Sequence, residues 1–97
     1  MIRIRWAPAA ADDLEAIYTY LRENHPAFAH TTIRKLYDAA RSLKQFPRRG
    51  RIGRLEGTRE FVMAPLPYII VYGVEIDVVH IFRVVHGSQD WPPKPRH

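Results

Sequence analysis

Hydrophobic and polar residues alternate at the start of the chain and then adopt a helical period. In residues 2–6, IRIRW, the apolar side chains fall on one side and Arg3 and Arg5 on the other, which predicts a half-buried strand. Pro8 suits the first turn of a helix. Apolar positions then recur at spacings of three and four residues, at Ala10, Leu14, Ile17 and Leu21. This part of the chain therefore predicts a strand followed by an amphipathic helix.

A second amphipathic helix is predicted to begin at Pro26, after the helix-breaking sequence ENHP. Its apolar positions have the same period as those of the first helix, and they are Ala29, Ile33, Leu36, Ala40 and Leu43. Because only a few residues join the two helices, they are expected to form an antiparallel hairpin.

The second half of the chain has the pattern of a loop followed by strands. Residues 46–60, FPRRGRIGRLEGTRE, contain one proline, three glycines and five arginines, and we interpret them as a loop with room for a short strand. Strands are expected at about 58–64, 66–74 and 78–85. The last two are almost continuously apolar, as strands covered on both faces usually are.

These elements predict an α+β fold, with an N-terminal strand, an antiparallel helix hairpin and three antiparallel strands in one small sheet. Two helices cover only one face of such a sheet, so something else must cover part of the other: the tail around Trp91, a second copy of the chain or a partner protein. At 97 residues the chain is expected to be a single domain, 1–97, with residues 87–97 as a C-terminal tail.

Composition excludes several classes of site. The chain has no cysteine, so disulfides and thiolate metal sites are excluded. His80 and His86 lie six residues apart without a set of carboxylates that resembles a metal site, and we expect neither a metal nor another cofactor. The N-terminal residues lack the apolar core of a signal peptide, and no stretch approaches the ~20 apolar residues of a membrane span. We therefore expect a cytoplasmic protein with no membrane partner.

The formal net charge is +5, and it is unevenly distributed along the chain. Between Arg34 and Arg59, nine basic residues stand against only Asp38 and Glu56. Such a field favours an acidic partner: nucleic acid, a nucleoprotein machine or an acidic protein segment. The alternative is a solvated basic surface that serves solubility alone.

Four segments in this order carry a resemblance to a known family: APAAADDLEAIYTYL, FPRRGRIGRLEGTREF, PYIIVYGVEIDVVHIFRVVHG and QDWP. Together they resemble the RelE/ParE toxins of type II toxin–antitoxin systems over nearly the whole chain, most specifically at GTRE, YIIVY and RVVHG. The resemblance implies a small α+β fold and a toxin that an antitoxin from the same operon holds inactive. It also implies one of two targets. RelE-like toxins enter the ribosome and cut messenger RNA, whereas ParE-like toxins are understood to poison DNA gyrase without hydrolysis of their own.

Cutting RNA without a metal requires a base for the 2′-hydroxyl, an acid for the leaving oxygen and cations for the phosphate. In this sequence His86 is the candidate base or acid, and Arg59 and Arg83 are the candidate phosphate ligands. Tyr68 and Tyr72 are poor bases at neutral pH because a phenol has a pKa of about 10. A nuclease site would therefore lack a convincing second proton-transfer group.

The family pattern favours the ParE-like branch. RelE-type nucleases carry an arginine at the position of Ile69 in YIIVY, and lysines or other functional side chains in the preceding strand, where this chain has Glu60 and Val62. One contact to a developing negative charge is often worth ~3–4 kcal/mol, so the loss of that arginine is expected to be severe.

Each candidate nuclease residue also has a structural interpretation. Arg83, inside an apolar strand, is expected to pair with a carboxylate such as Glu60 or Asp90. Arg59 is expected to orient a loop. His86, which stands just before a glycine, is expected to close the end of a strand by hydrogen bonding.

We predict a ParE-like toxin that inhibits DNA gyrase by direct binding and is neutralised by the acidic C-terminal segment of a cognate antitoxin. Contact with operator DNA is expected only through the antitoxin. The alternatives are a RelE-like ribosome-dependent mRNA endonuclease and an inactive toxin that retains only antitoxin binding. The predicted target contacts are Arg48, Arg49, Arg51, Arg54 and Trp91. The predicted antitoxin contacts are Leu14, Ile17, Leu21, Ile69 and Val71.

Overall fold

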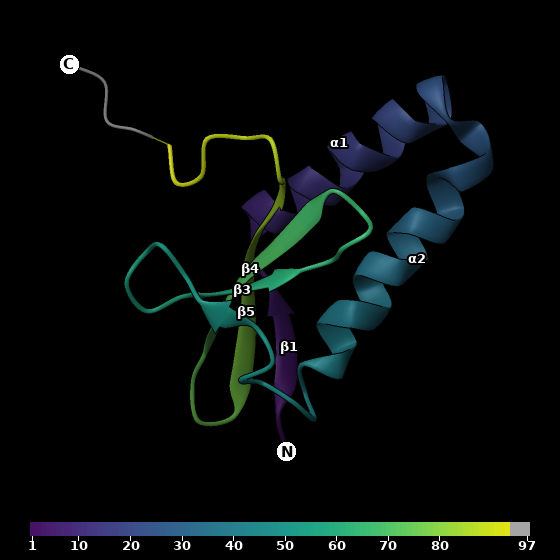
Figure 1. Cartoon of the computed structure of the whole chain (residues 1–97). Helices are drawn as coiled ribbons and strands as arrows, with labels where there is room; N and C mark the ends of the chain where they lie inside the picture. The colour runs from purple at the N-terminus through teal and green to yellow at the C-terminus, as the bar shows by residue number, and fades with distance from the viewer. Residues whose placement is uncertain (94–97) are drawn as a thin grey trace.

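The structure is a computed structural model that describes residues 1–93, which form two helices and five strands (Figure 1). In chain order the elements are β1 (Arg3–Trp6), α1 (Pro8–Asn24), α2 (Pro26–Ser42), β2 (Arg51–Ile52), β3 (Arg59–Val62), β4 (Tyr68–Val74) and β5 (Val78–His86). This order confirms the predicted strand, helix hairpin, loop and three strands, and β2 is the short strand within the loop. Of the predicted tail, residues 94–97 lie outside the described part of the chain.

The two helices begin where the prolines predict. Pro8 and Pro26 each lie in a first turn, where the missing N–H would have no partner within the helix in any case. His25 ends α1, because its backbone N–H donates to the carbonyl oxygen of Leu21 at 2.7 Å, and the same residue precedes the first turn of α2. A single residue therefore makes the turn of the hairpin.

One five-stranded sheet has the strand order β1-β5-β4-β3-β2. Neighbouring strands are antiparallel except for β1 and β5, which are parallel. The helices α1 and α2 lie on one side of this sheet (Figure 1). The fold class is α+β, as predicted.

The inner face of the sheet, which faces the helices, carries the main core. The apolar stripes of both helices are buried there together with alternate residues of β4, as periods of 3.6 and two predict. The buried members of this core are Ala10, Leu14, Leu36, Ala39, Ala40, Leu43, Tyr68, Ile70, Tyr72, Val79, Ile81 and Val84.

The outer face of the sheet is covered in part by the chain's own tail. Ile69, Val71 and Val85 form a second buried cluster on this face, and Trp91 packs against it. Of the three covers that the sequence suggests for this face, the structure shows the chain's own tail. Among residues 1–93, neither helix has the length and apolar composition that a membrane span needs.

Candidate functional site

Arg83 on β5 is held by a carboxylate of the first helix. Its Nε and Nη2 donate to Oδ2 and Oδ1 of Asp13 at 2.7 and 2.9 Å, and these hydrogen bonds raise the pKa of the guanidinium. The backbone N–H of Val84 donates to the same carboxylate at 2.9 Å. The guanidinium carbon of Arg83 also lies 5.5 Å from the ring centroid of Trp91. One carboxylate therefore ties α1 to β5 and, through the arginine, to the tail.

The topology explains why Asp13 is the partner of Arg83. β1 pairs with β5 only as far as Ile81, so the following N–H groups on that edge of β5 have no strand to bond. Asp13 supplies the acceptor in place of a strand. The predicted pairing of Arg83 with Glu60 or Asp90 is therefore wrong, and the true partner is 70 residues away along the chain.

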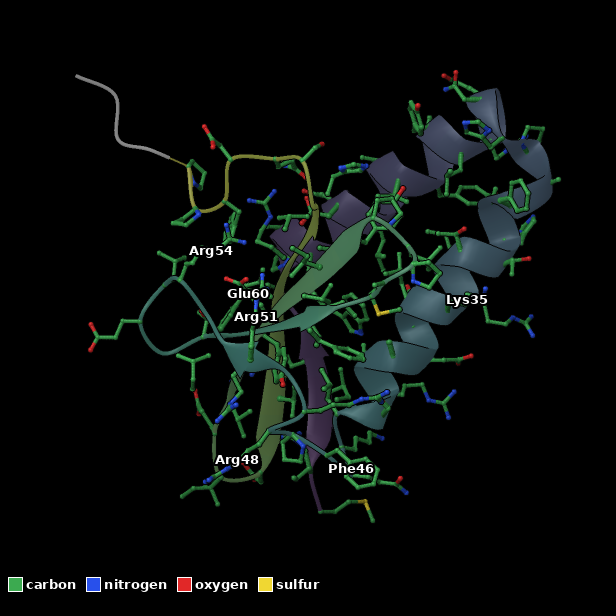
Figure 2. The ribbon with its side chains drawn as sticks, in the orientation of Figure 1. Lys35, Phe46, Arg48, Arg51, Arg54 and Glu60 are labelled. Carbon is green, nitrogen blue, oxygen red and sulfur yellow. The ribbon has the colours of Figure 1, made fainter. Side chains whose placement is uncertain are left out.

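Glu60 on β3 is buried beneath two arginines of the basic loop (Figure 2). Its side chain is 0% exposed, and its Oε1 accepts hydrogen bonds from Nη2 of Arg51 at 2.9 Å and Nη2 of Arg54 at 3.2 Å. Its Oε2 accepts the backbone N–H of Arg54 at 2.9 Å. Burial alone would raise the pKa of this carboxyl, but the hydrogen bonds outweigh burial and lower the pKa from 4.5 to about 2. Glu60 is therefore ionised at neutral pH.

Arg59 orients the loop that precedes β2, as its structural interpretation predicts. Its Nη1 donates to the carbonyl oxygen of Gly50 at 2.8 Å and to that of Arg48 at 3.4 Å. The hydroxyl of Tyr72 donates to the carbonyl oxygen of Pro47 and accepts the N–H of Gly50, both at 2.8 Å. Burial raises the pKa of Tyr72, so this phenol keeps its proton and fixes the loop.

His86 lies at the end of β5 and bonds to the turn that follows. Its Nδ1 accepts the backbone N–H of Ser88 at 3.1 Å and lies 2.7 Å from the Ser88 hydroxyl. Its backbone N–H donates to the side chain of Gln89, and its ring stands edge-on to that of Tyr68. These contacts close the end of the strand, which is the structural role expected for this histidine.

Arg59 and Arg83 lie on opposite faces of the sheet. The strand register places Arg83 opposite Val71, a member of the outer cluster, and Arg59 opposite Tyr72, a member of the inner core. A register shift in the β4–β5 pair between Val71 and Tyr72 changes which residues of β5 face outward. Two arginines that the sequence suggests for one phosphate are therefore separated by the sheet.

His86 is also distant from Arg59 along the sheet. His86 is opposite Tyr68 and Arg59 is opposite Tyr72, and four residues of a strand span about 13 Å. Ile69, where related nucleases carry an arginine, is 8% exposed and belongs to the outer cluster. The candidate nuclease residues therefore do not surround a common point.

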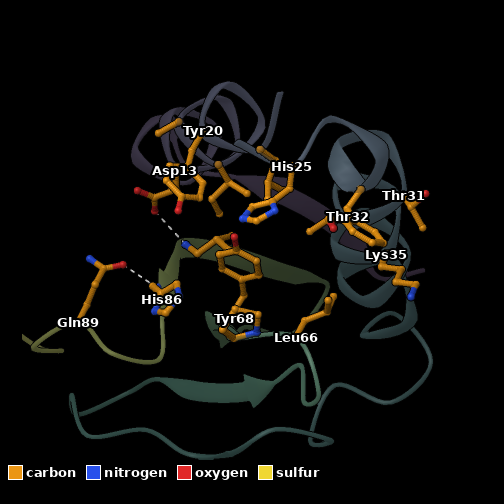
Figure 3. Close-up of a pocket in the computed structure, with 16 residues that line it drawn as sticks. Asp13, Tyr20, His25, Thr31, Thr32, Lys35, Leu66, Tyr68, His86 and Gln89 are labelled. Atoms are coloured by element: carbon orange, nitrogen blue, oxygen red, sulfur yellow. Dashed lines mark hydrogen bonds between the residues drawn. The ribbon is translucent and has the colours of Figure 1, made fainter. Parts of the chain in front are cut away.

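A groove with a cavity volume of about 860 Å³ opens between the helix hairpin and the adjoining ends of β4 and β5 (Figure 3). Its lining is mostly apolar or aromatic and includes Ile17, Tyr20, Leu21, Phe28, Tyr68 and Val84. The groove is also lined by three exposed residues with basic or titratable side chains, His25, Lys35 and His86. The groove therefore combines a mostly apolar lining with exposed basic or titratable side chains and one acidic residue, Asp13.

The predicted antitoxin contacts are divided among three places. Ile17 and Leu21 line the groove. Leu14 lies in the core beneath the helices, and Ile69 and Val71 lie on the outer face of the sheet. The structure therefore brings only Ile17 and Leu21 together at one surface.

The hydrophobic pattern of the sequence does not single out two aromatic residues of the groove. Tyr20 and Phe28 are 56% and 63% exposed, and neither belongs to an apolar helix stripe. The available signal was their size, because large aromatic side chains at solvent-facing helix positions often mark a contact surface.

The predicted target contacts are similarly divided. Arg51 and Arg54 bond to Glu60, whereas Trp91 packs on the outer cluster. Arg49 donates to the hydroxyl of Ser42 at 2.9 Å, and Arg48 is exposed. The predicted target contacts therefore do not share one environment.

Comparison with known proteins places these observations in a family context. Residues 4–91 match the family model described as ParE toxin of type II toxin-antitoxin system, parDE. The Y4kP protein of Sinorhizobium fredii is 39% identical over 90 residues, which cover 93% of each chain. The protein named toxin RelE2 of Caulobacter vibrioides is 37% identical over 89 residues, which cover 92% of this chain and 99% of that one.

A solved structure supports the fold independently. The structure described as the chromosomal ParDE TA system from P. aeruginosa superposes with a TM-score of 0.81 at 24% sequence identity. The match covers 89% of this chain and 96% of that chain. At this level of identity the likeness shows the arrangement of helices and strands.

Proposed function

Because this chain belongs to the ParE toxin family of type II toxin–antitoxin systems, we propose that it inhibits DNA gyrase by direct binding and performs no hydrolysis itself. The observation that carries this proposal is that Arg59 and Arg83 lie on opposite faces of the sheet, and that His86 lies about 13 Å from Arg59 along it. Each of them is also engaged within the protein, by loop carbonyls, by a carboxylate and by the following turn. Metal-free RNA cleavage needs such groups around one phosphate.

A RelE-like ribosome-dependent endonuclease is the second candidate, because a relative that is 37% identical carries the name RelE2. Against it, Ile69 offers no positive charge where related nucleases have an arginine. The loss of one such contact typically lowers the rate by about 10²–10³. Cleavage of mRNA by this chain is therefore expected to be absent or very weak.

Purified protein is expected to block supercoiling by gyrase, or to trap cleaved DNA, while leaving translated mRNA uncut. The double variant Arg48→Gln, Arg49→Gln should weaken inhibition about five-fold or more, since exposed cations speed association with an acidic target. The control Arg34→Gln, Arg41→Gln removes two exposed cations from α2 and should have a smaller effect. A supercoiling assay and primer extension on translated mRNA measure the two activities. Specific cuts in mRNA together with unaffected gyrase would overturn the proposal in favour of the endonuclease.

We also propose that an acidic, amphipathic segment of a cognate antitoxin occupies the groove between the helix hairpin and β4–β5. The apolar lining fits the apolar side of such a segment, and Lys35 and His25 fit its acidic side. The solved structure from P. aeruginosa is of a ParDE system, which supports a partner of this kind. A segment that orders on binding can cover a large surface of a small toxin, although ordering costs entropy.

Truncation of the exposed aromatic residues of the groove should weaken antitoxin binding without unfolding the toxin. Tyr20→Ala and Phe28→Ala remove side chains that are 56% and 63% exposed, and each is expected to raise Kd about ten-fold, as aromatic interface residues often do. The control is Ile76→Ala, in the turn between β4 and β5, whose side chain is 100% exposed and should not affect Kd. Isothermal titration calorimetry gives the Kd values. Equal Kd values for all three variants would show that the antitoxin does not bind in this groove.

A further inference from the structure

We infer that Arg51 and Arg54 form an anion-binding fork, positioned by Glu60, whose ligand is the phosphate backbone of duplex DNA. This inference rests on the proposed function, since an inhibitor bound to gyrase works beside duplex DNA. It adds a direct contact between the toxin and DNA, whereas the sequence predicts contact with operator DNA only through an antitoxin.

The geometry leaves one side of each guanidinium available to a ligand. Arg51 directs Nε and Nη2 at Oε1 of Glu60, at 3.3 and 2.9 Å. Arg54 directs Nε at Oε2 and Nη2 at Oε1, at 3.4 and 3.2 Å. A guanidinium has five N–H donors in a fixed plane, so the donors on Nη1 of both arginines remain for an external acceptor. The two side chains are 55% and 51% exposed, which makes these donors accessible.

The loop that carries the fork is fixed by its own hydrogen bonds. The N–H of Gly53 donates to the carbonyl oxygen of Thr58 at 2.8 Å, and the Thr58 hydroxyl donates to the carbonyl oxygen of Leu55 at 2.7 Å. A Cβ at Gly53 would overlap the Thr58 hydroxyl, so the two sides of the loop are in close contact. The backbone N–H of Arg54 is bound to Glu60 as well. Because the arginines are held in place before binding, a ligand loses less of its affinity to their ordering.

The charge of the fork suits a phosphate. Glu60 is ionised, so the three side chains together carry one net positive charge at neutral pH. The carboxylate occupies the inner edges of both guanidiniums. A phosphate group has several acceptor oxygens and can accept from the two outer edges at once, which is the kind of contact that arginine makes better than lysine.

A third arginine, Arg83, lies in line with the fork on the outer face, where it is paired with Asp13. The strand registers place Arg51 opposite Glu60, Glu60 opposite Val71 and Val71 opposite Arg83, which forms one row across four strands. Neighbouring strands are about 4.8 Å apart, so Arg83 lies about 10 Å from Glu60 across the sheet. The net positive charge of the fork, on a protein with a net charge of +5, fits an anionic partner such as a nucleic-acid backbone. Contacts of this kind fix position but do not read sequence.

Fluorescence anisotropy with a labelled duplex of about 20 base pairs, over a series of salt concentrations, tests the fork. Arg51→Gln and Arg54→Gln are each expected to weaken binding at least five-fold at low salt and to lower the slope of log K against log salt by about 0.9. Arg34→Gln is the matched control, because it removes an exposed cation of α2, on the other side of the sheet. Equal losses for the fork variants and the control would overturn the inference.

The variant Glu60→Gln distinguishes positioning of the two arginines from an effect of net charge alone. If net charge alone governed affinity, the variant would bind DNA more tightly, because it gains one net positive charge. The fork predicts weaker binding, because an amide does not hold two guanidiniums in place. Tighter binding by a variant that is folded by circular dichroism would overturn the inference. If this variant does not fold, Arg54→Lys serves instead: it keeps the charge but loses the planar edge, and wild-type DNA affinity would contradict the fork.

The same variants distinguish the fork from the proposed function. If wild-type protein inhibits gyrase while Arg51→Gln and Arg54→Gln bind DNA like the control, the fork is wrong and the proposed function stands. If DNA binding depends on the fork but wild-type protein leaves gyrase supercoiling unaffected, the fork is supported and the proposed target is wrong.

Discussion

Replacement of Asp13 by alanine is expected to lower the free energy of unfolding by about 3 kcal/mol, near the lower end for breaking a buried ion pair. The variant leaves the guanidinium of Arg83 and the backbone N–H of Val84 without their acceptor. In that variant water replaces part of the lost interaction, because the Arg83 side chain is 33% exposed, although the Asp13 side chain itself is only 16% exposed. The melting temperature should fall by about 12–24 °C, as measured by circular dichroism.

Asp12→Ala is the matched control for this prediction. Asp12 is the neighbouring carboxylate of α1 and is exposed, so its removal should change the stability by less than about 0.5 kcal/mol. Arg83→Ala should resemble Asp13→Ala, and the double variant should cost less than the sum of the two, because both remove one interaction. A fully stable Arg83→Ala protein that has lost toxicity would contradict the structural role and indicate a functional one.

Acidification from about pH 4.5 to 2 is expected to remove about 3 kcal/mol of stability through Glu60 alone. The pKa of this carboxyl is lowered from 4.5 to about 2 by folding, so the unfolded chain takes up the proton more readily. The stabilisation is therefore complete above pH 4.5 and is lost as the pH falls towards 2. Urea unfolding at a series of pH values measures this loss.

Two variants test the assignment to Glu60. Glu60→Gln should start from a lower stability at neutral pH, because an amide pairs poorly with two arginines, but it should lose about 3 kcal/mol less than wild type across this acid range. Glu56→Gln, in the same loop and exposed, should retain the wild-type acid profile. Parallel curves for wild type and Glu60→Gln would show that other groups govern acid unfolding.

The helices and the fold class were predictable from the sequence because their signals are local. The prolines at 8 and 26 and the spacing of apolar residues depend only on near neighbours in the chain, and both helices begin as expected. The partner of Arg83 has no local signal. Asp13 resembles an ordinary acidic residue near a helix start, and only the parallel pairing of β1 with β5 leaves Val84 in need of its carboxylate.

The candidate site was only partly predictable, since continuous apolar strands do not reveal which face a residue occupies. Ile69 and Val71 lie on the outer face, while Ile70 between them lies in the inner core, yet all three are equally apolar. The arginines of the loop before β3 present the same difficulty for prediction. They look equivalent in sequence, but Arg51 and Arg54 are bound to a buried carboxylate whereas Arg48 is exposed.

The parallel pairing of β1 with β5 also affects the order in which the sheet forms during synthesis. Each residue of Arg3–Trp6 is synthesised 75 residues before its register partner in Val78–Ile81. Closing a loop over most of the chain is slow, and β5 is needed by both β1 and β4. A nascent chain that does not yet include β5 therefore lacks the strand that joins β1 to β4, and its sheet is incomplete.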